Sequence, residues 1–170
     1  QQPAGHSLEF RQDEGFAVLN RSPGERASDF WGRVVCDATC IFVNRAGVNF
    51  QDGSFVDVGQ VIAAGGDISN ADFLAGQYRF SGLTGRVTNS GFLRDGSIAL
   101  LGSSVANFGH IETPDGSFLM AAGGEVVGEL TQDRLPAIVG VVGRLAKTIS
   151  VKGSVKTPAA KDTFQLQVAR

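Results

Sequence analysis

The sequence predicts an all-β protein built as a β-solenoid, in which short strands wind into stacked coils. The pattern of residues 87–100 returns at residues 105–120, and Asn89 recurs as Asn107. The Asp-Gly-Ser sequence that follows recurs two positions late, because the second copy carries a longer turn. A repeat of about 20 residues that keeps its apolar, Asn and Gly positions but tolerates insertion at a turn is typical of stacked coils. Each half also reads as strand, turn and strand, without helical spacing.

The composition favours the same fold class. The 170 residues include 23 glycines and 12 phenylalanines, but one Trp and one Tyr, a mixture that suits strands joined by tight turns. Asp-Gly-Ser sequences begin at Asp52, Asp95 and Asp115, and each precedes an apolar segment. Asp-Gly favours a turn because Gly accepts positive φ and Asp bonds to its own backbone. We therefore expect three turns that each start a strand, within about eight coils of roughly 21 residues.

The first third of the chain contains short candidate strands between turn residues. Residues 8–10 and 16–19 flank the turn at 13–15, and a loop follows at 21–26. Short apolar runs bounded by Gly, Pro, Asn and Asp are typical of strands. Further strands are expected at three segments: residues 31–35, 41–43 and 55–58.

Residues 67–80 interrupt the coil pattern. Asp67 or Ser69 is placed to cap a single helical turn that ends before Gly76. An excursion packed on the flank of the solenoid fits the same residues equally well. From residue 135 the chain again alternates in the manner of strands.

The bulk composition excludes several classes of partner. With 15 Lys and Arg against 17 Asp and Glu, the formal net charge is -2, so we expect neither nucleic acid nor an anionic membrane surface as a partner. No run of 18 uncharged apolar residues occurs, which predicts a soluble chain without membrane insertion. Residues 1–6 lack the basic start and apolar core of a signal peptide. We expect a chain that has been processed already or belongs to something longer.

Short motifs follow one another over residues 8–125. They lie at residues 17–21, 41–50, 56–59, 67–69, 72–73 and 80–82, and the repeat pair runs on through Ala-Ala-Gly at 121–123. In this order they resemble the secretion domain of filamentous-haemagglutinin-type exoproteins, which are the passengers of bacterial two-partner secretion. The order of so many short matches makes the resemblance more specific than any one of them.

The resemblance implies a right-handed parallel β-helix. It further implies export to the periplasm, recognition there by the transport-associated domains of a dedicated outer-membrane β-barrel, and delivery to the cell surface. The family's Asn-Pro-Asn-Gly-Ile element, which the transporter recognises, falls on five residues of this chain: Asn44, Arg45, Ala46, Gly47 and Val48. Asn and Gly keep the turn, whereas the proline and the second asparagine are replaced. Family domains begin with a cap of several strands, and residues 1–7 are too few for one, so we expect an uncapped N-terminal end.

We expect a haemagglutinin-type β-helix domain over residues 1–135 and a strand-rich tail over residues 136–170. The tail segment 137–143 is uncharged and strongly β-prone. Either it folds back as a cap of its own chain, or it stacks on the first coil of a second copy and so generates a filament. The candidate self-association residues are Ile138, Val139, Val141 and Val142.

Cys36 and Cys40 are the only cysteines and lie at an expected turn between two strands. In an oxidising periplasm or outside the cell, a pair at this spacing favours a local disulfide over two free thiols. Its expected role is to hold one corner of the coil. A zinc site is not expected, because His6 and His110 are the only histidines and neither is spaced as a ligand to this pair.

The repeated polar residues are expected to have structural roles. Asn89 and Asn107 should stack at one corner of successive coils and form an amide ladder. The Asp-Gly-Ser aspartates lack the spacing of a calcium loop. His110 occupies the place of Phe92 in the repeat, which indicates a stacking residue and not a general base. We predict no metal, no cofactor and no catalytic residue, since Gly-x-Ser-x-Gly, dinucleotide and phosphate-loop patterns do not occur.

Two classes of function fit these observations. The first is a secreted, non-enzymatic bacterial surface protein, adhesive or structural, that contacts a host or neighbouring-cell surface. In one version of this class the chain is a whole subunit that assembles end to end into a fibre. In the other it is the transporter-recognised secretion domain of a larger exoprotein adhesin. The expected lack of an N-terminal cap favours the whole subunit. The second class is a β-helical polysaccharide lyase or hydrolase with Asp57, Asp67 and Asp72 as its candidate acids. We predict the first class, because nothing in the repeat places two carboxyl groups together.

Overall fold

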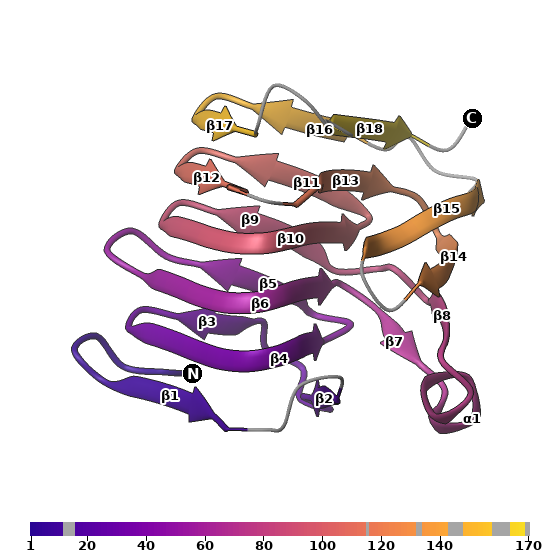
Figure 1. Ribbon diagram of the computed structural model, residues 1–170, viewed down its shortest axis with the longest axis horizontal. Helices are drawn as coiled ribbons and strands as arrows, with labels where there is room; N and C mark the ends of the chain where they lie inside the picture. The colour runs from indigo at the N-terminus through magenta and orange to yellow at the C-terminus, as the bar shows by residue number, and fades with distance from the viewer. Residues whose placement is uncertain (12–15, 115, 132–133, 143–147, 158–163, 169–170) are drawn as a thin grey trace.

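The computed structural model describes residues 1–11, 16–114, 116–131, 134–142, 148–157 and 164–168 and shows a parallel β-helix (Figure 1). The coils stack from the indigo N-terminal end to the yellow C-terminal end, and a separate sheet lies on one flank. The fold class expected from the repeat is confirmed, and so is the excursion near residues 67–80. Within the described residues, no helix has the length and apolar character needed to span a membrane.

Two walls of the coil share one nine-stranded sheet, and three long strands run through both walls. The long strands are β4 (Arg33–Val43), β6 (Phe55–Ala64) and β10 (Phe92–Gly102). Their first halves form the first wall with β1 (Ser7–Phe10), β12 (His110–Glu112) and β17 (Ser154–Lys156). Their second halves form the second wall with β2 (Ala17–Arg21), β13 (Phe118–Ala122) and β18 (Phe164–Val168).

A third wall closes the coil with a five-stranded parallel sheet. Three of its strands, β3, β5 and β11, come directly after a second-wall strand, whereas β9 and β16 come after strands of the flanking sheet. All five precede a strand of the first wall (Figure 1). The five strands are β3 (Ser28–Phe30), β5 (Gly47–Phe50), β9 (Arg86–Asn89), β11 (Ser104–Asn107) and β16 (Thr148–Val151).

The first wall has six rungs among the described strands, in the order β1-β4-β6-β10-β12-β17. The expectation of about eight coils is therefore wrong. Two segments leave the stack to build the flanking sheet, whose strands are β7 (Asp67–Ile68), β8 (Gln77–Ser81), β14 (Glu125–Thr131) and β15 (Arg134–Val142). The tail divides between both parts: β15 joins the flank, whereas β16, β17 and β18 continue the stack, and the expected domain boundary at residue 135 falls inside β15.

The coil interior is filled by the inward side chains of all three walls. They form one buried apolar cluster. Its largest fully buried members include Phe50, Leu93, Ile98, Leu100, Ile111 and Phe118. Burial of such side chains removes apolar surface from water, which is the main favourable contribution to the folding of the stack.

The second wall is also buried on its outer face, where the flanking sheet covers it (Figure 1). Ile41, Ile62 and Leu101 point outward into a second apolar cluster that includes Tyr78 and Phe80 of the flanking sheet. A sheet buried on both faces reads as a continuous apolar run. This explains the uninterrupted apolar stretches at the ends of the three long strands.

The segment 67–80 contains both features that the sequence left open. Ser69 caps α1 (Asn70–Leu74), since its hydroxyl accepts a hydrogen bond from the Asp72 backbone N–H at 3.0 Å. The strands on either side of this short helix, β7 and β8, pair with each other in antiparallel fashion and belong to the flanking sheet.

The three Asp-Gly-Ser sequences do not share one conformation. Asp52 and Gly53 form a turn, with Gly53 at a φ of 82°. Asp95, by contrast, lies within the strand β10 and pairs with Val58, so the expectation of a turn there is wrong. The glycine after Asp95 is required by close approach, because a Cβ at that position would lie 2.5 Å from the Gly59 carbonyl oxygen. Residue 115 lies outside the described residues.

Asn89 and Asn107 are direct partners in neighbouring strands of the third wall, and both side chains are fully buried. The Asn89 amide donates to Asn107 Oδ1 at 2.9 Å, and the Asn107 amide donates to the Ser154 carbonyl at 3.2 Å. Gly109 packs against Gly91, since a Cβ on Gly109 would lie 2.1 Å from the Gly91 carbonyl oxygen. The buried amides thus join three successive coils at one corner.

Candidate functional site

The turn at residues 44–48 connects β4 to β5, and Asn44 holds it together. The Asn44 side chain is 1% exposed, and its Nδ2 donates to the Arg26 carbonyl and to Ser28 Oγ, each at 2.9 Å. Its Oδ1 accepts from the Ala46 backbone N–H at 2.8 Å, and its carbonyl accepts from the Gly47 N–H at 2.9 Å. Asn is suited to such a turn because its short amide side chain bonds to the backbone two residues on.

Gly47 and Val48 fix the end of the turn. Gly47 has a φ of 125°, and a Cβ there would lie 2.7 Å from the Arg86 carbonyl oxygen, so this position requires glycine. Val48 is fully buried and pairs with Val87. Arg45 differs from them, because its side chain is 66% exposed. The turn therefore presents one arginine to solvent on a rigid backbone.

A cavity of about 290 Å³ opens beside this turn. One side is formed by the loop that follows β2 and another by the start of the flanking excursion. Its lining residues are Arg21, Ser22, Pro23, Gly24, Val43, Arg45, Gly66 and Asp67. The two arginines and one carboxylate give the lining an excess of positive charge, on a chain whose net charge is -2.

Arg21 holds the excursion against the first coil. Its guanidinium donates to Asp67 Oδ1 at 2.8 Å, to the Ile68 carbonyl at 2.6 Å and to Asn70 Oδ1 at 3.0 Å. The other oxygen of Asp67 lies 3.9 Å from Arg45 Nη2. A planar guanidinium fixes several acceptors at once, which an ammonium group does not. Asp67 therefore interacts with both arginines, and it links the turn at 44–48 to the residues that Arg21 binds.

Sequence reasoning missed the role of Arg21. Its partners lie 46 to 49 positions further along the chain, and no local spacing pattern relates residues that far apart. From the sequence, Asp67 is a candidate helix cap and a candidate acid, but not a partner of Arg21. The one usable signal was an arginine at the end of a strand, directly before the Pro-Gly loop.

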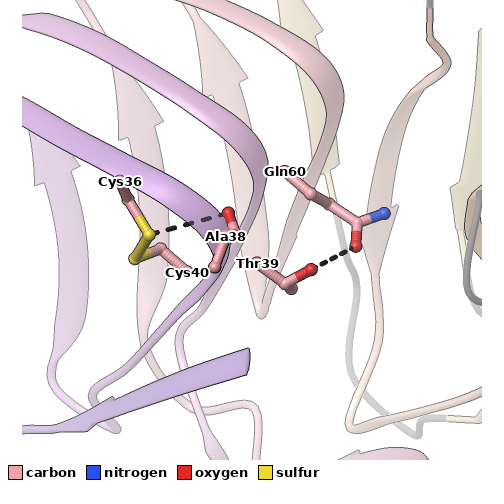
Figure 2. Close-up of a disulfide and its surroundings, with 5 residues drawn as sticks. All are labelled: Cys36, Ala38, Thr39, Cys40 and Gln60. Atoms are coloured by element: carbon pink, nitrogen blue, oxygen red, sulfur yellow. Dashed lines mark hydrogen bonds between the residues drawn. A yellow bond between two sulfur atoms is a disulfide. The ribbon is translucent and has the colours of Figure 1, made fainter. Parts of the chain in front are cut away.

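The disulfide expected from the sequence is present between Cys36 and Cys40, whose Cα atoms are 6.4 Å apart. Both residues are buried in the coil interior. Figure 2 shows the bond at the corner between the first and second walls, with the Ala38 carbonyl 3.6 Å from Cys36 Sγ. Beside it, Thr39 Oγ1 donates to Gln60 Oε1 of the next coil at 2.9 Å.

His110 lies in a column of rings on the outer face of the first wall. Its ring stands 4.8 Å from that of Phe92, which in turn lies 5.3 Å from Phe55. His110 Nδ1 is also hydrogen-bonded to the hydroxyl of Ser154. The position is that of a stacking residue between successive coils.

Among the side chains that the structure describes, Glu112 and Tyr78 have shifted pKa values. A hydrogen bond from Lys156, 3.2 Å away, lowers the pKa of Glu112, and this pair joins the last two rungs of the first wall. Burial of Tyr78 between the flanking sheet and the second wall raises the pKa of its hydroxyl group. The charges of Lys156, Arg94 and His110 also lower the pKa of Glu112, whereas burial is the one cause for Tyr78.

The three candidate acids have separate partners. Asp57 pairs with Arg33 at 3.3 Å, Asp67 pairs with Arg21, and Asp72 accepts from Ser69 Oγ at 2.7 Å. The described residues contain no group of three or more His, Cys, Asp or Glu side chains that could hold a metal ion. Among the described residues, the turn at residues 44–48 combines a cavity with an exposed positive charge.

Neither a protein-family model nor a curated protein sequence matches this chain. Among solved structures, the crystal structure of the HMW1 secretion domain from Haemophilus influenzae is similar, with a TM-score of 0.72 and 23% sequence identity. The chain has the fold of a secretion domain. The likeness covers 81% of this chain and 39% of the HMW1 chain. The resemblance stated from the sequence is confirmed at the level of the fold.

In this secretion-domain fold the candidate self-association residues, Ile138, Val139, Val141 and Val142, lie in β15. This strand pairs in antiparallel fashion with β14 of its own chain and forms one edge of the flanking sheet. The backbone of β14 therefore occupies one side of β15. Self-association through this segment stays a prediction.

Proposed function

We propose that this chain is the secretion domain of a larger, non-enzymatic bacterial exoprotein, an adhesin exported to the periplasm and delivered to the cell surface by an outer-membrane two-partner-secretion transporter. The observation that carries the proposal is the fold shared with the HMW1 secretion domain over 81% of the chain. The order of the motifs over residues 8–125 supports it as well, since it is a property of the sequence alone. The chain spans well under half of the length of the HMW1 chain.

We place transporter recognition at the turn 44–48 and the cavity beside it. The hydrogen bonds of the buried Asn44 and the close packing of Gly47 against Arg86 hold the turn in one conformation, so little conformational entropy is lost when a partner binds. Arg45 supplies an exposed guanidinium at the mouth of the cavity. A guanidinium recognises a carboxylate or a row of carbonyl oxygens through paired hydrogen bonds. The part of the transporter that docks here is therefore expected to present acceptor groups.

Secretion into the medium tests the proposal. The chain, supplied with a signal peptide, is co-produced with the transporter of its own secretion system or produced alone. We expect it in the medium only when the transporter is present, and in the periplasm otherwise. Equal amounts in the medium with and without the transporter would contradict the proposal.

Arg45→Ala tests the recognition surface, and Arg94→Ala is its matched control because Arg94 is exposed on a different wall. We expect Arg45→Ala to weaken binding to the periplasmic domains of the transporter about tenfold, equal to about 1.4 kcal/mol. Thermal stability should be unchanged, since exposed substitutions rarely move it by more than about 0.5 kcal/mol. Equal binding by both variants would remove Arg45 from the recognition surface.

End-to-end assembly into a fibre is the second candidate. It is favoured by β15, which among the described strands pairs only with β14 and so forms one edge of the flanking sheet, because an unpaired strand edge recruits further strands. Light scattering at rising concentration and negative-stain images distinguish fibres from monomers. We expect Val139→Lys with Val141→Lys to block assembly while leaving the circular-dichroism spectrum of the coil unchanged, because charge at a strand edge deters pairing with a further strand.

A further inference from the structure

The middle of β4 holds one residue more than the strand beside it. Cys36 pairs with Val58 and Thr39 pairs with Gln60, so two residues of β4 oppose the single residue Gly59 of β6. This is a β-bulge, and it lies at the corner between the first and second walls. On the other side of β6, the strand β10 crosses the same corner without an extra residue. The bulge is therefore a property of β4.

The disulfide spans this bulge. Residues four apart in a straight strand have Cα atoms about 13 Å apart, which is too far for a disulfide. The Cα atoms of Cys36 and Cys40 are 6.4 Å apart because the chain turns the corner between them. The bond is thus compatible with a bulged corner at residues 37–38 and incompatible with a straight strand through those residues.

The apolar pattern by itself does not determine which face of residues 40–43 points inward. Cys40 and Phe42 point into the coil, whereas Ile41 and Val43 point outward under the flanking sheet, and all four are buried. A slip of one residue exchanges the two faces of a strand. Here such a slip exchanges one apolar pair for another, so the hydrophobic penalty that normally opposes slippage is small.

We propose that the Cys36–Cys40 disulfide is a register lock for the second half of β4. By holding the extra residue at the corner, it decides which face of residues 40–43 enters the coil. The hydrogen bond from Thr39 to Gln60 acts in the same direction, because it pairs the first side chains after the bulge (Figure 2). β4 also pairs with β1, β2 and β6, so its register sets that of three coils.

The lock exists only when the two thiols are oxidised. Disulfides form and persist outside the cytosol, so a chain that folds in a reducing compartment lacks the lock. A single native register is therefore tied to folding in an oxidising environment. This inference concerns the chain's own folding and stands whether or not the proposed function is correct.

Backbone amide NMR spectra of the refolded chain test the lock. The oxidised chain should give one resonance for each amide of residues 39–43. The Cys36→Ala/Cys40→Ala variant, and the wild-type chain refolded with a reductant, should give a second set confined to residues 39–43 and their partners at 17–21 and 60–64. We expect the second set at about one tenth or more of the main intensity, a free-energy gap of about 1.4 kcal/mol or less.

Deletion of Ala38 in the double-alanine background is the rescue variant. It gives β4 the same number of residues at the corner as β6 and should restore a single set of resonances. A single set in both the reduced wild-type chain and the double variant would overturn the proposal. Loss of all structure in both would overturn it too, because a local register change leaves the later coils folded. Failure of the deletion to restore one set would likewise show that the bulge is not the source of the second register.

Discussion

Buried amides connect one coil to the next at the scale of single residues. Asn107 receives a hydrogen bond from Asn89 below it and donates one to the Ser154 carbonyl above it. Both asparagines are removed from water, so each lost hydrogen bond leaves a polar group without compensation from solvent. The repeat keeps Asn at this place because its side chain both donates and accepts.

Replacement of Asn107 by Ala is expected to lower the free energy of unfolding by about 1–3 kcal/mol, since it removes both bonds and leaves the Ser154 carbonyl without the Asn107 amide. For a chain of this size the melting temperature should fall by about 2–4 °C for each kcal/mol. The control is Asn49→Ala, which removes a half-buried amide on the outer face of the third wall. A loss in the control equal to that of Asn107→Ala, measured by calorimetry, would contradict this account.

The flanking sheet is the element that separates this protein from a bare stack of coils. It covers the outer face of the second wall, and Tyr78 of β8 is buried in that interface. Burial disfavours the charged phenolate and so raises the pKa of Tyr78. The folded protein keeps the Tyr78 hydroxyl neutral up to a higher pH than the unfolded chain does. The contribution of this group to the free energy of unfolding is therefore fully present below the unfolded pKa of about 10 and is lost as pH rises through the folded pKa.

Tyr78 is the single tyrosine of the chain, so the ultraviolet absorbance of the phenolate reports on it alone. We expect its titration midpoint to lie above the ordinary value of about 10 in the native protein and to return to that value in denaturant. Tyr78→Phe should reduce the loss of stability at alkaline pH, because it removes the ionising group and keeps the ring. If the titration midpoint of Tyr78 in the native protein lay at or below the midpoint in denaturant, Tyr78 would not be buried between the flanking sheet and the second wall in solution.

At the scale of the whole molecule, the stack behaves as a one-dimensional array in which each coil contacts its neighbours. The last rung of the first wall, β17, pairs with one described strand, β12, whereas inner rungs pair on both sides. The ion pair between Glu112 and Lys156 joins these two strands. The pKa of Glu112 is lowered by that hydrogen bond, so its stabilising contribution is present above the ordinary glutamate pKa and is lost as pH falls through the lower folded value.

Acidification is expected to loosen the last rung before the inner coils. Amide protection factors of β17 should fall once the pH drops below about 4, while those of β6 and β10 remain high. Glu112→Gln should remove this pH dependence, because the variant carries no ionisable group at that position. Loss of protection in all rungs at the same pH would contradict end fraying and indicate cooperative unfolding of the stack.

The amino-acid sequence by itself determined the features that depend on neighbours within about one coil. The pairing of Asn89 with Asn107, the stacking of His110 on Phe92 and the Cys36–Cys40 disulfide all follow from short spacings. A coil repeats its geometry every turn, so equivalent residues recur at nearly constant intervals and the pattern is visible in the chain. The strand-rich fold class could be predicted for the same reason.

The number of coils, the flanking sheet and the cavity beside Arg45 were decided by the tertiary structure. The outer face of the second wall is apolar and must be covered, and the segments that cover it come from two distant parts of the chain. Arg21 likewise meets Asp67 only after two coils have been stacked. Asp95 lies in a strand because β6 beside it continues through the corner, which overrides the local turn preference. Contacts across dozens of residues leave no local pattern, since they depend on which surfaces the finished coils leave exposed.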